Sequence, residues 1–490
     1  MTAGGQVLTP LRIERMALEH GLRRAPYVSG RGPGGRAPRT DVPTVIAGVA
    51  GALSPEVRPA DLVVAERLRT GDTDVTLPAA PLLAGALRRA GLTVHVGTIE
   101  TTDHVVTGVE RAQLADRGAL AVDTESGYLA GQLDPRRLAV VRAVVDTADD
   151  PLVHPGTLKR GVAALRALRR AAPVIQDWID ACADRTIVRA EPQSFCAGVE
   201  RAIEIVERAL AKHGAPVYVR RQIVHNTHVV TELERRGAIF VQELEEVPEG
   251  AVAVLAAHGV APSVRVQAIE RRLQVIDATC PLVAKVHQEV RRFTGAGRTV
   301  FLIGHAGHEE VVGTRGEAPD RVVLIESVQD ARTVQVPDPD QVSYVMQTTL
   351  SVEEADEIAA VLRERFPALQ APRRDDICYA TSNRQQAIRD VAAVTELVLV
   401  VGSPNSSNST RLTEVSRAAG TPAHLIEDAS ALDLRWLHGV HRVGVSAGAS
   451  APPSLVIELI DALAAFGHLE VTQVGGITET VQFTLPREVV

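Results

Sequence analysis

Three of the four cysteines in the chain lie where short strand-like runs or turns end, and thiols at such places can bind metals or act as nucleophiles. Cys196, Cys280 and Cys378 are 84 and 98 residues apart (280 − 196 and 378 − 280), and each interval is long enough for one small α/β lobe. Ligands in parallel α/β lobes gather at the carboxyl ends of strands. Three lobes with one thiol each would therefore place three thiols around one point.

Three thiolates without a fourth protein ligand suit a metal centre that keeps one coordination position for substrate, as catalytic zinc sites do. Soft sulfur ligands also suit iron–sulfur clusters. The sequence contains no C-x-x-C pair, so the spacing alone leaves open that each cysteine is a buried thiol without a function. Cys182 lies on an amphipathic segment beside Ile179, and we expect it to be structural.

Polar side chains follow apolar strand-like runs in the same part of the chain. These are His225, His258, His305, His308, Glu310, Thr348, Thr349 and Ser450. A single histidine there is usually a satisfied loop residue, but several that converge on three cysteines favour a functional site. The stretch 402–410, GSPNSSNST, lies between a strand-like run and a helical pattern. Small hydroxyl and amide groups at a helix N-terminus bind anions without any lysine, although they also form ordinary N-cap turns.

The elements that must position these residues are short. Strand-like runs such as Leu138–Val145, Thr299–Ile303 and Leu397–Val401 alternate with helical patterns such as Val199–Lys212 and Val352–Phe366. Strand–helix alternation predicts an α/β protein with largely parallel sheets.

One domain boundary is expected near residue 185. A long helical pattern, Thr157–Cys182, precedes a strand-like run at Thr186–Ala190. The predicted domains are therefore residues 1–185 and 186–490, and the cysteine spacing divides the second into lobes at about 197–280, 281–375 and 376–470.

The composition excludes several classes of protein. The net charge is −8, so we expect no binding to nucleic acid or to an anionic membrane surface. No apolar run approaches the roughly 20 residues that span a bilayer, and the N-terminal residues lack the pattern of a secretory signal. We expect a cytoplasmic protein whose thiols stay reduced.

Successive motifs of the second domain resemble those of the 4-hydroxy-3-methylbut-2-enyl diphosphate reductase family. They are FCAGVERAIEIVERAL, VYVRRQIVHNTHVV, AAHGVAPSVR, DATCPLVAKVH, LIGHAGHEEVVGTRGE, MQTTLSVEEAD, DDICYATSNRQQAI, VVGSPNSSNSTRL and SAGASAPPSLV. The resemblance implies three α/β lobes in a trefoil around an iron–sulfur cluster. It also implies reduction of an allylic diphosphate, with loss of its hydroxyl, to isopentenyl and dimethylallyl diphosphate. This is the last step of the non-mevalonate isoprenoid pathway, and ferredoxin or flavodoxin would supply the electrons.

The resemblance also implies roles for individual residues. Cys196, Cys280 and Cys378 would hold a [4Fe–4S] cluster whose fourth iron is open to the substrate hydroxyl. Glu310 would be the proton source, with Thr348 as a relay. The residues that would bind substrate are His225, His258, His308, Thr349, Ser406, Ser407, Asn408 and Ser450. The chain departs from the family at Pro192-Gln193-Ser194, where Pro-Arg-Gly is usual; this alters the backbone and charge beside the first ligand.

Residues 1–185 resemble the nucleoside phosphorylase and nucleosidase superfamily through IAGVAGALSPEVRPADLVVAERL, AVDTESGYLA and VRAVVDTADD. A Met-Glu pair contacts the ribose in that superfamily, and here Thr124-Glu125 takes its place. Asp146 matches the aspartate that protonates the purine. Glu125 and Asp146 are therefore candidate site residues of a nucleosidase or phosphorylase activity. The alternative is a degenerate domain used for packing or regulation.

A further alternative is that the whole chain is an iron–sulfur sensor without turnover. The matched polar residues argue against a sensor, because it needs thiols but no diphosphate site.

Overall fold

The computed structural model describes residues 4–32, 38–71, 73–149 and 152–490. The chain forms two compact units. The first contains Met1–Ile187, Asp428–Val443 and Ile457–Val471, and the second contains Val188–Glu427, Gly444–Val456 and Thr472–Val490. Strand β9 (Arg185–Glu191) begins where the sequence predicts the second domain to begin. The predicted boundary stays a prediction, because the first unit also includes two segments from late in the chain.

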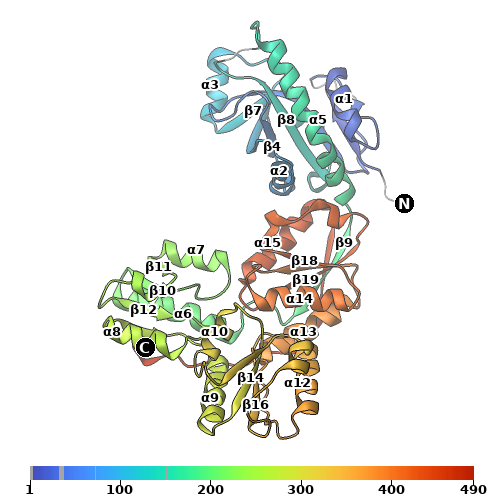
Figure 1. The fold of residues 1–490 in the computed structure, drawn as a ribbon. Coiled ribbons are helices and arrows are strands. Elements are labelled where there is room, and N and C mark those ends of the chain that lie inside the picture. Colours follow the sequence, from blue (N-terminus) through green and yellow to red (C-terminus); the bar gives the residue numbers. More distant parts are fainter. Residues whose placement is uncertain (1–3, 33–37, 72, 150–151) are drawn as a thin grey trace. The chain divides into compact units, whose positions relative to one another are not determined.

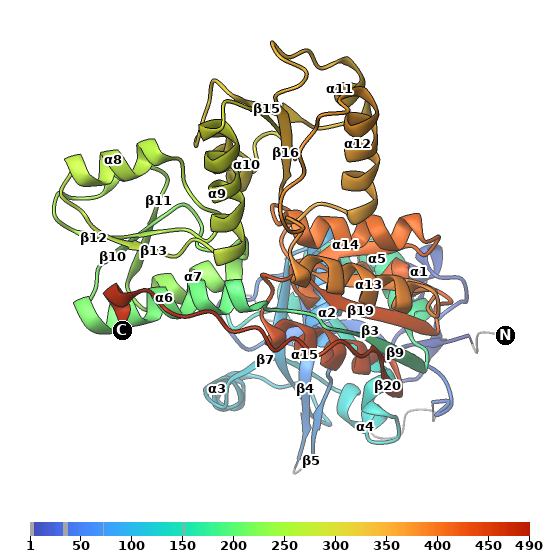
Figure 2. The same ribbon diagram turned by 90° about the horizontal axis from the view of Figure 1, so that it is seen from below.

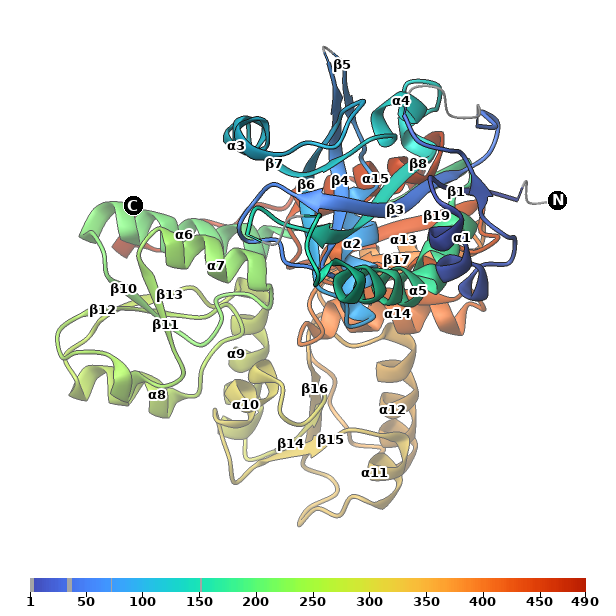
Figure 3. The same ribbon diagram turned by 90° about the horizontal axis from the view of Figure 1, so that it is seen from above.

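The first unit contains an eight-stranded mixed sheet with the order β2-β1-β3-β7-β6-β4-β5, in which β8 pairs with both β3 and β4 (Figure 3). Its strands are β1 (Gln6–Thr9), β2 (Tyr27–Val28), β3 (Thr44–Ala52), β4 (Leu62–Thr70), β5 (Thr73–Thr76), β6 (Val94–Thr101), β7 (Ala119–Asp123) and β8 (Leu138–Asp146). Its helices are α1 (Arg12–Leu18), α2 (Ala80–Arg89), α3 (Gly108–Asp116), α4 (Ser126–Ala130) and α5 (Thr157–Ala181). All nine residues of β8 are buried, as expected for a strand covered on both faces.

The second unit is built around three sheets (Figure 1). The first has the order β11-β10-β12-β13, the second β15-β14-β16 and the third β18-β17-β19-β9-β20. The strands are β10 (Val217–Arg220), β11 (Ala238–Val241), β12 (Val252–Leu255), β13 (Gln274–Asp277), β14 (Thr299–Ile303), β15 (Val322–Ile325), β16 (Val342–Met346), β17 (Leu397–Val401), β18 (Ala423–Ile426), β19 (Arg442–Ala447) and β20 (Leu469–Gly475). All pairings in the first two sheets are parallel, so the predicted α/β class is confirmed.

Helices connect these parallel strands. They are α6 (Ala197–His213), α7 (Thr227–Arg235), α8 (Pro262–Glu270), α9 (Pro281–Gly295), α10 (Glu309–Arg315), α11 (Val328–Thr333), α12 (Val352–Arg365), α13 (Tyr379–Ala392), α14 (Ser407–Ala418) and α15 (Pro453–Leu463). Helix α6 begins two residues before the predicted Val199, directly after Cys196. Among the described residues, no helix is long and apolar enough to cross a membrane.

The last residues of the chain, 476–490, lack regular structure apart from one short 3-10 turn at Arg487–Val489. They run from β20 to the side of α6, where the C-terminus lies (Figure 2). Val489 is buried in the core of the first lobe, and Leu485 packs against the same core. The tail is therefore anchored on a lobe other than the one from which it departs.

Candidate functional site

Each of the three cysteines occupies the same local position, the residue that precedes a helix. Cys196 is the N-cap of α6, Cys280 that of α9 and Cys378 that of α13. The backbone N–H of each donates to a carbonyl oxygen beyond the end of another strand, at Ala449 (3.3 Å), Ala257 (2.9 Å) and Thr348 (3.1 Å) respectively. Helix N-termini carry partial positive charge, so all three helices favour thiolates and a negatively charged ligand at this place.

The three sulfur atoms converge on one cavity of about 120 Å³, which Cys196, Cys280 and Cys378 all line. A side chain at Gly198 would come within 2.8 Å of the Cys280 Sγ and 3.8 Å of the Cys196 Sγ, so only glycine leaves room for a bound group there. Burial, helped by the neighbouring thiols, raises the pKa of Cys280 to about 12 and that of Cys378 to about 11. A metal ion bound to the sulfurs would stabilise their thiolate forms and so offset the energetic cost of burying negative charge. Three soft sulfur donors of this kind fit an iron–sulfur group.

Three histidine rings form a second cluster in the same cavity. The centroids of His225 and His258 are 4.1 Å apart, and His308 lies 5.7 Å from the first and 6.0 Å from the second. Burial lowers the pKa of His225 and of His308 to about 4, and it lowers the pKa of His258 well below the usual value. The Nδ1 atom of His258 is buried and makes no hydrogen bond in the described part of the chain, although Oε2 of Glu309 lies 3.5 Å from it. The rings are uncharged at neutral pH and ready to interact with an anion.

Glu310 is a buried carboxyl group on the first turn of α10. Its Oε1 accepts the backbone N–H of Thr348 at 2.6 Å, and its Oε2 lies 2.9 Å from the Thr348 hydroxyl. Burial raises the pKa of Glu310 to about 7, although both bonds from Thr348 oppose this rise. The group can therefore hold a proton at neutral pH inside the cavity.

Small hydroxyl and amide groups form another wall, at the start of α14. Ser406 is the N-cap of this helix, and its Oγ accepts hydrogen bonds from Ser409 (3.0 Å) and Ser450 (3.3 Å). Asn408 uses its Oδ1 to accept the Ala449 N–H at 3.0 Å. Its Nδ2 is buried and has no partner among the residues that the structure describes. This wall presents a helix N-terminus and an unused amide donor to the cavity.

The cavity unites all the residues that the family resemblance assigns to this site, whereas His305 lies outside it, with its Nε2 2.9 Å from an Arg411 nitrogen. Thr349 and Ser407 join the same wall, with 3.1 Å between their hydroxyl oxygens. The sequence analysis missed Phe483, an apolar residue of the C-terminal tail that also lines the cavity. Gln347 was missed as well, and its amide donates to Thr349 at 2.8 Å. Its position directly before Thr348 and Thr349, which the sequence does single out, was a signal, whereas nothing in the sequence around Phe483 marks it.

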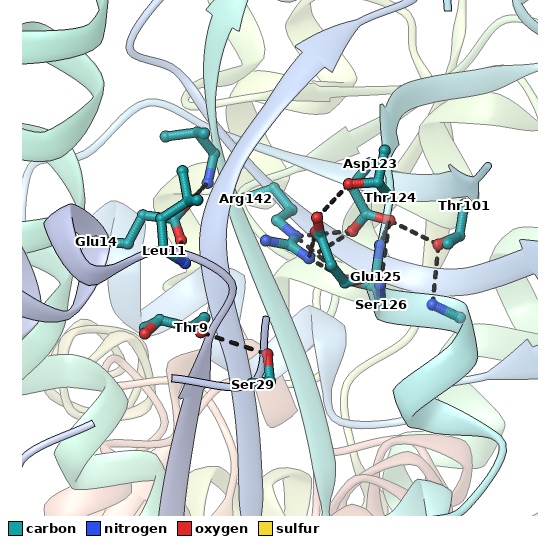
Figure 4. A network of polar contacts seen from close by, with 12 residues as sticks. Thr9, Leu11, Glu14, Ser29, Thr101, Asp123, Thr124, Glu125, Ser126 and Arg142 are labelled. Carbon is teal, nitrogen blue, oxygen red and sulfur yellow. Dashed lines mark hydrogen bonds and ion pairs between the residues drawn. The ribbon is translucent and has the colours of Figure 1, made fainter. Parts of the chain in front are cut away.

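The first unit has its own polar cluster, centred on Arg142 in β8 (Figure 4). The fully buried guanidinium pairs with Asp123 at 2.8 Å and with Glu125 at 3.1 Å, and it donates to Ser126. Burial opposes the positive charge, but the attraction of Asp123, Glu125 and Glu14 outweighs it and raises the pKa of Arg142. The carboxylate of Glu125 is thus held by an arginine of the same domain.

Asp146, the second candidate residue of the first unit, is also paired with an arginine. Arg111 donates to its Oδ2 at 2.7 Å and to its backbone oxygen at 3.1 Å. Both candidate carboxylates line a cavity of about 350 Å³ that Glu14 and Asp123 share. The structure brings Glu125 and Asp146 to one cavity, but an internal counter-ion satisfies each of them. Sequence analysis missed Arg142, whose signal was a lone charge within the apolar run AVVRAVV.

Comparison with known proteins identifies the family of the chain. A 4-hydroxy-3-methylbut-2-enyl diphosphate reductase from Acidothermus cellulolyticus is 57% identical over 305 residues, which cover 62% of this chain and 90% of that protein. The solved structure of the E-1-hydroxy-2-methyl-but-2-enyl-4-diphosphate reductase from Plasmodium falciparum is 35% identical and has a TM-score of 0.60, covering 63% of this chain and 97% of that one. A 5'-methylthioadenosine/S-adenosylhomocysteine nucleosidase from Helicobacter pylori is similar at 16% identity and a TM-score of 0.28, over 35% of this chain and 97% of that one. The model of the LytB protein family matches residues 187–464, and the chain belongs to this family.

Proposed function

We propose that residues 186–490 catalyse the reductive dehydroxylation of 4-hydroxy-3-methylbut-2-enyl diphosphate to isopentenyl and dimethylallyl diphosphate. Family membership supports this reaction, and the cavity supplies the groups that it needs. The observation that carries the proposal is the convergence of Cys196, Cys280 and Cys378 with the histidine cluster and Glu310 in a single cavity.

The three cysteines would hold a [4Fe–4S] cluster and leave one iron without a protein ligand. The bound cluster would supply electrons and a Lewis acid for the substrate hydroxyl. An external donor such as ferredoxin or flavodoxin would provide the two electrons of each turnover. The N-termini of α6, α9 and α13 would offset the negative charge of the thiolates.

Glu310 would supply the proton that the departing hydroxyl requires. In its protonated form the Oε2–H can donate to the Thr348 hydroxyl, 2.9 Å away, because Oε1 already accepts the Thr348 N–H. The hydroxyl hydrogen of Thr348 is then free to point toward the substrate. Thr348 would in this way relay a proton from a buried acid to the reacting oxygen.

The diphosphate would bind among His225, His258 and the N-terminus of α14. Ser406, Ser450 and the free amide of Asn408 can donate hydrogen bonds to its oxygens, with Thr349 and Ser407 beside them. Negative charge next to the histidine rings would raise their pKa values, so substrate binding would be accompanied by proton uptake. His308 would lie between the diphosphate and the reacting carbons. Charge-assisted hydrogen bonds of this kind contribute roughly 1.5–3 kcal/mol each.

Anaerobic purification followed by iron and sulfide analysis tests the proposal. We expect about four irons and four sulfides per chain for a [4Fe–4S] centre. Turnover of the allylic diphosphate with a chemical reductant should accompany them. A chain that binds no iron after anaerobic reconstitution would refute the reductase proposal, whereas a chain that holds the cluster without turnover would support the sensor alternative.

For the first unit we infer that nucleoside cleavage is absent. The observation behind this inference is that Arg142 holds the carboxylate of Glu125 and Arg111 holds that of Asp146. Each ion pair holds the carboxylate in place and takes up part of the hydrogen-bonding capacity that a ribose or a purine would need. Incubation of the full chain with purine nucleosides, with and without phosphate, should release no free base. Release of base that Glu125→Gln abolishes would establish the nucleosidase alternative.

A further inference from the structure

Each helix that begins at one of the three cysteines carries a basic residue in its second turn. Arg201 lies five residues after Cys196, Lys285 five after Cys280 and Arg384 six after Cys378. None of the three side chains lines the cavity that the thiols share. Each instead reaches away from its own cysteine, toward the loop that carries another.

Lys285, on helix α9, binds the loop before Cys378. Its Nζ donates to the backbone oxygens of Arg374 (2.7 Å) and Asp375 (2.6 Å) and to the carboxylate of Asp376 (3.0 Å). An ammonium group has three N–H donors, so this one loop uses all of them. Asp376 is itself fixed, because its second oxygen accepts the backbone N–H of Met346 at 3.0 Å.

Arg201, on helix α6, binds the loop before Cys280. Its guanidinium donates to the backbone oxygens of Ala278 and Thr279, each at 3.2 Å. These residues precede Cys280 by two positions and one. The Nε of Arg201 donates to the oxygen of Thr484 at 2.8 Å, which ties the C-terminal tail to the same point.

Arg384, on helix α13, completes the set by binding the turn before Cys196. It is fully buried and donates to the backbone oxygens of Ser194 (2.8 Å) and Phe195 (3.2 Å). Ser194 has a φ of +62°, a left-handed conformation that a serine adopts only when its surroundings hold it there. Glu479 of the tail pairs with Arg384 at 3.0 Å and compensates its buried charge.

The three contacts form a closed cycle. The helix of Cys196 holds the loop of Cys280, the helix of Cys280 holds the loop of Cys378, and the helix of Cys378 holds the turn of Cys196. We propose that Arg201, Lys285 and Arg384 are positioning residues that each fix the next cysteine of the cycle, so that the three thiols are preorganised together for the cluster. This inference rests on the proposed function, because it assigns a task to residues around the proposed cluster site.

Taken alone, each contact is explained by a cation that satisfies carbonyl oxygens in a loop. The cycle predicts more, because it specifies which cysteine each cation holds. Removal of one cation should loosen the next cysteine and leave the cysteine at the head of its own helix in place. A general loss of stability would loosen all three cysteines alike.

The test follows the accessibility of each thiol in the full chain. The variants Arg201→Met, Lys285→Met and Arg384→Lys are prepared anaerobically, treated with an iron chelator and exposed to iodoacetamide, and modification of each cysteine is followed by mass spectrometry. We expect Lys285→Met to speed the labelling of Cys378 by about tenfold, with Cys280 little changed, because only one loop opens locally. Arg201→Met should act on Cys280, and Arg384→Lys on Cys196.

The rate of iron release to the chelator gives a second readout, and it should rise in all three variants. Arg208→Met is the matched control and should change neither readout, because Arg208 is an exposed residue of α6 whose one ion-pair partner among the described residues is Glu204. Lys285→Arg, which keeps a charge and several donors, should restore much of the native pattern. Faster labelling of a variant's own cysteine, or equal acceleration at all three, would overturn the proposal.

Separate results decide the reductase proposal and the positioning proposal. A chain that binds no iron would refute the proposed iron–sulfur cluster, but the labelling of the thiols would still show whether the three cations order the cysteine loops. If a methionine variant does not fold, as judged by circular dichroism, the remaining variants decide, since each link makes its own directional prediction.

Discussion

Replacement of Glu310 by glutamine is expected to lower turnover by about a hundredfold or more, the usual contribution of a positioned general acid. Glutamine fills the same space and can still accept the backbone N–H of Thr348, so iron content and substrate affinity should stay close to those of the native chain. It cannot release a proton to the Thr348 hydroxyl. Single-turnover measurements with a chemical reductant, together with iron analysis, test this expectation.

Turnover of the native chain should also depend on pH through the protonation of Glu310. Burial raises the pKa of Glu310 to about 7, and the protonated form is the proposed donor, so turnover should be full below this value and fall as the pH rises through it. The alkaline fall should be absent from the residual activity of Glu310→Gln. Glu326→Gln is the matched control, because Glu326 is exposed in the same lobe and its carboxylate accepts the N–H of Ala306, its one hydrogen-bond partner in the described part of the chain. Near-native turnover of Glu310→Gln would remove Glu310 from the mechanism.

In the first unit, Arg142→Met should lower the free energy of unfolding by about 3–5 kcal/mol. The substitution keeps the approximate length of the side chain but removes the positive charge that faces Asp123, Glu125 and Glu14. A buried carboxylate without a counter-ion costs far more than an exposed ion pair contributes. Chemical denaturation of the full chain, analysed at the transition in which the first unit unfolds, measures the change.

The deficit of Arg142→Met should shrink in acid. Burial raises the pKa of Glu14 above its ordinary value, and loss of the Arg142 charge, which opposes this rise, would raise it further. Such a group destabilises the fold above its unfolded pKa, and the penalty disappears as falling pH protonates it. Arg67→Met, which removes a half-exposed partner of Asp74, should cost less than about 1 kcal/mol at any pH. If Arg142→Met is as stable as the native chain, the stability of the polar cluster in the first unit does not depend on the charge of Arg142.

Much of the reductase site could be predicted from the sequence because its residues follow strand ends. The strands β14 and β17 have the predicted bounds, and polar residues after them reach one cavity. The pattern of short, continuous apolar runs identifies such elements, because both faces of each of these strands are buried. It does not determine which strands become neighbours, so nothing local predicted that β9 would join the sheet of the third lobe.

The cycle of cations could not be predicted for a different reason. The chain has 52 basic residues, so a basic residue near a cysteine carries little information. Only the structure distinguishes Lys285, whose three donors are all used by one loop, from the exposed arginines on neighbouring turns. The pairing of Glu125, the N-cap of α4, with Arg142 in β8 was hidden in the same way, because it depends on which elements become neighbours in the fold.

The place of β9 has a consequence for how the polypeptide matures on the ribosome. This strand is synthesised before the first two lobes, but its sheet neighbours β19 and β20 are synthesised after them. The sheets β11-β10-β12-β13 and β15-β14-β16 can each form from a continuous stretch of sequence. Strand β9 can pair with β19 and β20 only when translation is almost complete. Cys196 lies five residues after the end of β9. Under the proposed function, binding of iron by all three sulfurs would therefore take place in the released chain and not in the nascent one.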